Sequence, residues 1–153
     1  MIDEIVTNWL NDSQDALVEN YNKLGLRASG NWSNELETYS NITPTKITAG
    51  IKGAAYTGAL TFGRSQNMNQ EPEVIKRWVG WAGNTIIKKW CEDKGVNISP
   101  FAVAYKIARE GWRVPNRFNP GGLVDDVFTD ARIKLLTDQI FGSMISKWKS
   151  DVF

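Results

Sequence analysis

The spacing of apolar residues changes from a helical period to a strand period and back, and this constrains the fold more than any other feature. Over residues 2–24 apolar side chains recur about every 3.6 residues, which predicts a long amphipathic helix. Gly25 suits the left-handed position just beyond the end of that helix. Apolar and polar residues then alternate over 32–42, 47–51 and 56–62, which predicts three short strands.

The second half of the chain returns to the helical period. It predicts helices over 72–90, 99–110 and 124–149, the first two of which begin with proline in a position that suits a first turn. Gly80 and Gly83 leave open whether the stretch 72–90 forms one helix or two.

These elements predict an α+β fold: a single domain over residues 1–153, in which a small antiparallel sheet carries the N-terminal helix and three or four further helices. A compact chain of this length removes about 68–70% of its unfolded surface from water. We therefore expect a hydrophobic core that needs no disulfide.

The chain has no histidine, which excludes Ser-His-Asp and Cys-His nucleophile systems and histidine-ligated zinc. Its single cysteine, Cys91, has lysine neighbours that are able to lower its pKa, but without a partner base it is expected to be a packing residue. Glycine-rich phosphate-binding motifs are absent. We therefore expect no metal, no cofactor and no enzymatic activity. A carboxylate-dependent hydrolase remains an alternative, with Glu71, Glu73 and Glu110 as its candidate acids.

Nothing in the sequence predicts a membrane protein. No stretch approaches the roughly 18 apolar residues that a spanning helix needs. The first ten residues, MIDEIVTNWL, carry acids where a signal peptide carries Lys or Arg. We expect a protein that is made in the cytoplasm and has no membrane partner.

Charge is distributed unevenly. Residues 1–62 hold seven acidic and four basic side chains, whereas residues 63–120 hold ten basic and five acidic ones. A basic region is suited to a nucleic-acid backbone. It is equally suited to an acidic face on a second copy of the chain, in a heterologous contact that closes into a ring. Chance unevenness on a solvated surface is the third interpretation.

Arg64 lies in the polar segment 63–72, and Arg109, Arg113 and Arg117 lie in or beside the second irregular segment, 112–122, together with Trp112 and Phe118. Exposed arginine beside an aromatic ring grips phosphate and stacks on bases, and it is also the composition of a protein–protein hot spot. Non-sequence-specific nucleic-acid binding by the region 63–120 is therefore the alternative to a protein interface. Its candidate DNA-facing residues are Arg64, Arg109, Arg113 and Arg117.

The order of these pieces resembles a known family. The segments are AYTGALTFGR (55–64), PEVIKRW (72–78), AYKIAREGW (104–112) and NRFNPGG (116–122). Together they are similar to the small minor-tail or tail-completion proteins of tailed bacteriophages, found at the head–tail junction. The family commonly has Glu-Phe-Gly-Thr where this chain has Thr61-Phe62-Gly63-Arg64, and Gly-Thr at Gly111-Trp112.

The resemblance implies a structural virion protein. Such a protein would be assembled in the cytoplasm of the host bacterium and form a homo-oligomeric ring in the neck of the particle. Its partners would be copies of itself, the portal or connector, and tail proteins, with double-stranded DNA passing through the ring without specific readout.

Two sets of residues are then expected to act in assembly. The polar loop 63–72 has no obvious partner in its own chain, so we expect Arg64, Gln66, Asn67 and Asn69 to become ordered against a neighbouring protein. Trp112 follows a helix end, where its own chain offers few neighbours four residues further on, and packing on its own core is the alternative to an interface role. We expect it to lie in a subunit interface with Arg113, Arg117 and Phe118, opposite Asp12, Asp15 and Glu19 of the next copy.

Overall fold

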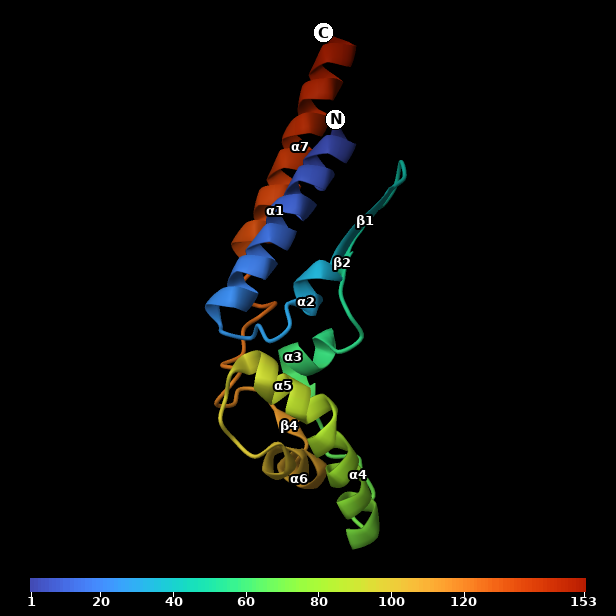
Figure 1. Cartoon of the computed structure of the whole chain (residues 1–153). Helices are drawn as coiled ribbons and strands as arrows, with labels where there is room; N and C mark the ends of the chain where they lie inside the picture. The colour runs from blue at the N-terminus through green and yellow to red at the C-terminus, as the bar shows by residue number, and fades with distance from the viewer.

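The computed structural model describes all 153 residues and has an elongated shape, with a pair of long helices at one end and shorter helices at the other (Figure 1). The amphipathic stretch at the start of the chain forms α1 (Ile2–Lys23), whose buried positions follow the helical period from Val6 to Tyr21. Gly25 follows it with φ +70°, as predicted. α1 packs against α7 (Asp130–Val152), which runs antiparallel to it, so both chain ends lie at the same end of the molecule.

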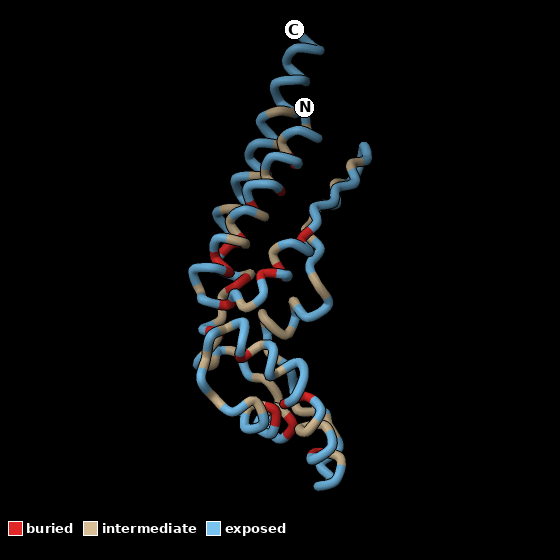
Figure 2. The backbone as a smooth tube through the Cα atoms, viewed as in Figure 1, coloured by how far each residue is buried: buried red, intermediate tan, exposed pale blue.

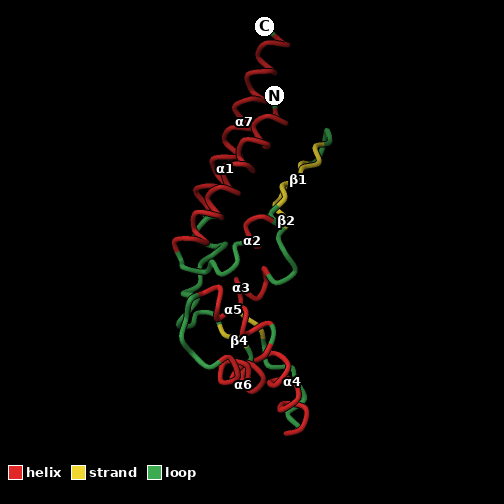
Figure 3. Tube along the Cα trace, in the orientation of Figure 1, coloured by secondary structure: helices red, strands yellow, loops and turns green.

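The two predicted strands near the start are present, but the first is shorter than expected. β1 (Glu37–Ile42) pairs antiparallel with β2 (Ile47–Lys52), with Glu37 opposite Lys52 and Ile42 opposite Ile47. Together they form a two-stranded ribbon that projects beside α1 (Figure 3). The residues before β1 form α2 (Asn31–Asn34) instead of a strand, because Trp32 turns inward and is buried.

The predicted third strand over 56–62 is wrong. Residues Thr57–Phe62 form α3, in which Leu60 packs against the core while Phe62 is 78% exposed. Tyr56 and Leu60 lie one helical turn apart, and the Leu60 amide donates to the Tyr56 carbonyl. Alternation over so few residues fits either period, so the pattern alone did not separate strand from helix.

Three helices form the other end of the molecule: α4 (Pro72–Asn84), α5 (Ile86–Lys94) and α6 (Pro100–Glu110). The stretch 72–90 is thus divided between two helices, and the break falls at Thr85, with φ −125° and ψ −97°, and at neither glycine. Gly83 has another role, because a Cβ there would lie 2.5 Å from the ring of Phe101 on α6.

Side-chain hydrogen bonds cap the starts of α6 and α7. Ser99 Oγ accepts a hydrogen bond from the amide of Ala102 and so caps α6, as the Ser-Pro start predicts. α7 begins later than the predicted residue 124, because the hydroxyl of Thr129 accepts from the Arg132 amide and caps the helix there. The turn before it buries Leu123 and Val127.

The main core lies where α1, α2 and the segment before α7 meet, near the middle of the molecule (Figure 2). The rings of Tyr21 and Trp32 pack there with centroids 4.7 Å apart. The Asn20 side chain donates to the carbonyls of Gly122 and Leu123, and so ties α1 to this segment. The core residues are Leu17, Tyr21, Leu26, Trp32, Leu36, Leu123 and Val127.

The chain exposes much more surface than a compact fold of its size. Its accessible surface is 10,355 Å², against about 24,900 Å² for the unfolded chain, so folding buries about 58% of it. The expected 68–70% is therefore wrong, because the elongated arrangement leaves only 19 of 153 residues buried. The α+β fold class is confirmed, with two separate two-stranded antiparallel sheets. No helix combines the length and the apolar content that crossing a bilayer requires.

Candidate subunit interface

The second sheet brings the two polar segments together. β3 (Gly63–Arg64) pairs antiparallel with β4 (Trp112–Arg113), so that Arg64 lies opposite Trp112. Each strand is preceded or opened by a glycine with positive φ, Gly111 at +77° and Gly63 at +78°. A Cβ on Gly111 would lie 2.4 Å from the Arg64 carbonyl oxygen, and one on Gly63 would lie 2.3 Å from that of Trp112. Both positions therefore require glycine for the strands to approach.

Beside β4 lies a groove of about 500 Å³, which we call the basic groove. α6 forms one wall and the segment after β4 forms the other, and Glu110 is the single acidic residue among those that line it. Three exposed basic residues share this lining with the apolar side chains: Lys106, Arg113 and Arg117. The arrangement combines an apolar floor with a positive rim, which suits a partner that presents carboxylates.

The aromatic side chains of the groove contact one another. Trp90 on α5 meets Trp112 edge-on with centroids 6.1 Å apart, and it meets Phe118 edge-on at 5.2 Å. The Arg117 guanidinium lies over the Phe118 ring, 5.4 Å from its centroid. Trp112 thus has an aromatic neighbour from a distant part of its own chain, which favours the alternative that it packs within the chain. Its role in a subunit interface stays a prediction, as do those of Arg113, Arg117 and Phe118.

Two asparagines that the sequence did not single out hold the segment after β4. Asn116 accepts hydrogen bonds from the amides of Phe118 and Asn119 and donates to the Arg113 carbonyl. The buried Asn119 donates to the Leu60 carbonyl at 2.8 Å and accepts from the Gly121 amide at 2.9 Å. Side-chain turns of this kind are typical of asparagine near proline and glycine, and this was the available signal. They fix the position from which Arg117 projects.

The polar loop 63–72 also has partners within the chain. Gln66 and Gln70 donate to the Ala108 carbonyl on α6, at 3.5 and 3.0 Å, and Asn69 Oδ1 accepts from the Glu71 amide at 2.9 Å. The expectation that nothing in a single chain holds this loop is therefore wrong at these residues. Further ordering of Arg64, Gln66, Asn67 and Asn69 on assembly stays a prediction.

The four arginines do not form one continuous surface. Arg64 and Arg113 line a common hollow beside the two short strands. Arg113 also lines the basic groove with Arg117, whereas Arg109 lies apart from these three, in a hollow shared with Lys76 and Tyr105. All four side chains are exposed.

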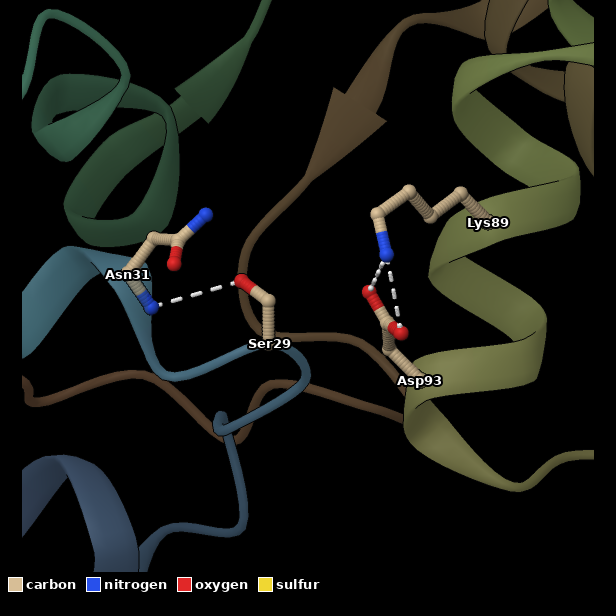
Figure 4. Close-up of polar contacts among 4 residues, drawn as sticks. All are labelled: Ser29, Asn31, Lys89 and Asp93. Carbon is tan, nitrogen blue, oxygen red and sulfur yellow. Dashed lines mark hydrogen bonds and ion pairs between the residues drawn. The ribbon is translucent and has the colours of Figure 1, made fainter.

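The acidic residues expected opposite the groove lie elsewhere in the chain. Asp12, Asp15 and Glu19 are exposed on α1, on the side away from its buried face. The two ion pairs within the chain use other residues, Lys89–Asp93 on α5 (Figure 4) and Lys134–Asp138 on α7. Asp12, Asp15 and Glu19 therefore form no ion pair within their own chain, and their carboxylates are exposed to a second molecule.

The candidate acids lie in two different elements. Among the candidate acids, Glu110 lines the basic groove, while Glu71 and Glu73 are exposed at the start of α4. No group of three or more acidic, cysteine or histidine side chains is placed to hold a metal ion. Burial raises the pKa of the Cys91 thiol, and the Glu92 carboxylate raises it further. The thiol is thus buried and protonated, as expected of a packing residue.

Comparisons of the chain with protein-family models, with curated proteins and with solved structures find no match.

Proposed function

We propose that this chain is a structural protein of a tailed-bacteriophage particle and that copies of it form a ring at the head–tail junction, around the channel for DNA. The observation that carries the proposal is the surface area. A compact monomer of this mass exposes about 7,800 Å², so the 10,355 Å² of this chain exceeds that value by about 2,600 Å².

That excess matches what a ring subunit buries. A subunit in a ring has two neighbours, and an obligate interface buries about 1,000–2,500 Å² on each partner. Two interfaces of about 1,300 Å² per side account for the whole excess. The position of exposed acids on α1 and of exposed arginines around the basic groove further supports a heterologous contact, because the two sets lie on different parts of the chain.

The resemblance to tail-completion proteins supports the head–tail junction as the location of the ring. It rests on the segments 55–64, 72–78, 104–112 and 116–122, and three of these contribute to β3, β4 or the basic groove. In this proposal the ring contacts the portal or connector on one side and tail proteins on the other. DNA passes through it without base readout.

Non-specific nucleic-acid binding is the second candidate, favoured by the exposed arginines Arg64, Arg113 and Arg117 around β4. Stacking on bases needs free aromatic faces. Trp112 and Phe118 are instead engaged with Trp90 and Arg117, which argues for the protein interface.

The test is the oligomeric mass of the purified protein by native mass spectrometry, alone and mixed with portal and tail proteins of the same phage. We expect a closed oligomer of fixed copy number that binds at least one of these proteins. A monomer that binds none of them contradicts the proposal. A monomer that binds DNA with an affinity falling steeply as salt rises supports the second candidate.

A further inference from the structure

Helix α7 carries an apolar face that its own chain leaves uncovered. None of its residues is buried, and the half-buried ones, Arg132, Leu136, Ile140 and Ser143, mark the side that faces α1. Six of its exposed apolar residues recur at helical spacing on another side, and Leu135 lies apart from them. We call them the α7 stripe: Ile133, Phe141, Met144, Ile145, Trp148 and Val152, each at least 47% exposed.

The β1–β2 ribbon carries a second apolar face, whose apolar side chains are half-buried. We call residues 37–52 the arm. The pairing register places Ile42 opposite Ile47 and Ser40 opposite Ala49, and side chains alternate along each strand, so these residues share one face with Ile51. Ile51 packs against the core at the base of the arm, whereas Ile42, Ile47 and Ala49, nearer its tip, are half-buried and lie outside the core cluster.

On the opposite face of the arm, the arm's own side chains pack over its backbone, and Tyr39 remains 44% exposed. There Tyr39 lies so close over Gly50 that a Cβ on this glycine would be 2.5 Å from the tyrosine hydroxyl. The Lys52 ammonium sits over the same ring, 5.6 Å from its centroid. A two-stranded ribbon alone is marginally stable in water, so the apolar face is the one that needs a partner.

The arm and the α7 stripe lie on two sides of α1. α1 contacts α7 along one side and the two strands of the arm along another, and the arm extends toward the same end of the molecule as α7 (Figure 1). One chain is therefore not arranged to cover its own α7 stripe with its own arm. A copy placed beside it presents an α7 stripe to the first arm and offers its own arm to a third copy.

We infer that the apolar face of the arm of one copy covers the α7 stripe of the next copy, in a contact repeated around a ring. The inference rests on the proposed ring and identifies one of the surfaces that hold it. Such a contact is heterologous, with different surfaces meeting, which is the type that closes into rings. It uses isoleucine and alanine side chains against phenylalanine, methionine and tryptophan.

This contact differs in kind from an ion-pair contact in the basic groove. Ile42, Ile47 and Ala49 carry no charge, and on α7 Lys134 and Asp138 neutralise each other. The arm contact therefore responds weakly to salt, whereas pairing of arginines with carboxylates weakens as salt rises.

Disulfide trapping tests the contact directly. Ala49→Cys places a thiol on the apolar face of the arm and Ile145→Cys places one in the α7 stripe, while the native Cys91 is buried. We expect a disulfide dimer when the two single variants are mixed at equal concentration under mild oxidation, and little dimer from either variant alone. The double variant should give a ladder of linked species up to the full ring. Thr48→Cys, on the opposite face of the arm, is the matched control and should give at least tenfold less dimer with Ile145→Cys.

The outcomes separate this inference from the proposed function. A wild-type protein that stays monomeric contradicts both. A wild-type ring in which Ala49→Cys and Ile145→Cys form no dimer overturns the inference and leaves the ring standing. Dimers of Ile145→Cys with itself, or equal trapping by Thr48→Cys, also overturn it. As an independent check, Phe141→Asp should weaken assembly at least tenfold with unchanged helical circular dichroism. Unchanged assembly of that variant contradicts the inference.

Discussion

The indole of Trp112 stands edge-on to the indole of Trp90, with the planes at 79° and the centroids 6.1 Å apart. Trp90 belongs to α5 and Trp112 to β4, so this pair joins two elements that share no backbone hydrogen bonds. Phe118 completes the group by meeting the same Trp90 ring. The aromatic cluster is thus a structural support for the basic groove as well as part of its lining.

Trp112→Ala is therefore expected to destabilise the fold. Removing a half-buried indole from this cluster should lower the free energy of unfolding by about 2 kcal/mol. Denaturant unfolding followed by circular dichroism measures it, and Trp112→Phe, which keeps an aromatic ring, should lose less. Wild-type stability with lost assembly would show instead that Trp112 acts in the interface between copies.

Arg117→Glu is expected to leave the fold intact and weaken assembly by about 2 kcal/mol, because the exposed guanidinium sits on the rim of the groove. Native mass spectrometry as a function of concentration measures the loss. Arg109→Glu is the matched control, since Arg109 lies outside the basic groove. Equal losses of DNA affinity in both variants, with normal assembly, would favour nucleic-acid binding.

If the α1 acids are the partners of Arg117, a charge swap should restore the contact. Asp15→Arg alone should weaken assembly, and mixing it with Arg117→Glu should recover part of the loss, because the two reversed charges again attract at the heterologous interface. Sedimentation of the single variants and of their mixture checks this. No recovery in the mixture would mean that Asp15 does not face the groove.

Asn119→Ala is expected to cost about 2 kcal/mol of stability, because it leaves the Leu60 carbonyl and the Gly121 amide without their partner. Thermal or denaturant unfolding gives the value. Asn97→Ala, at an exposed position, is the control and should change stability by less than about 0.5 kcal/mol. Equal stabilities of the two variants would contradict this role of Asn119.

The Cys91 thiol predicts a pH dependence. Because burial raises its pKa in the folded protein, the folded state keeps the thiol proton to higher pH than the unfolded state does. Its contribution to stability is present below the unfolded pKa and is lost as the pH rises through the folded pKa. The stability difference between wild type and Cys91→Ala should therefore shrink as the pH rises above about 8.5, the pKa of an unperturbed cysteine. A constant difference would contradict the raised pKa.

Loop 63–72 is expected to gain protection on assembly. Gln66 and Gln70 already tie it to Ala108, but Arg64 and Asn67 are exposed in the single chain. Amide hydrogen exchange of free and assembled protein compares the two states over residues 64–70. Equal protection in both would show that the intrachain bonds suffice.

Much of the local structure follows from the sequence. The helical period gave α1, and the Ser-Pro start and terminal glycine gave α6, because capping and periodicity are local properties. The strand predicted over residues 56–62 was wrong, because the few apolar residues of this segment fit both the strand and the helix period. The packing of Leu60 against the core accompanies the helix that forms instead.

The candidate site could be predicted from the sequence only in part. The sequence indicated that arginines and aromatics gather near residues 112–118, and the structure places them around one groove. The sequence gave no sign that Trp90, more than twenty residues earlier, would contact the ring of Trp112. Contacts between residues so far apart depend on how whole helices pack, which local patterns do not encode.

The amino-acid sequence by itself determined which stretches are helical, where several of them end, and which side chains carry charge, because these depend on neighbours a few positions away. Only the tertiary structure decided that α7 packs on α1 with one side and leaves Phe141 and Trp148 in solvent. It also decided that the arm contacts α1 and does not cover α7. The physical reason is that an apolar residue favours burial without specifying its partner. The arrangement of whole elements decides whether that partner lies in the same chain.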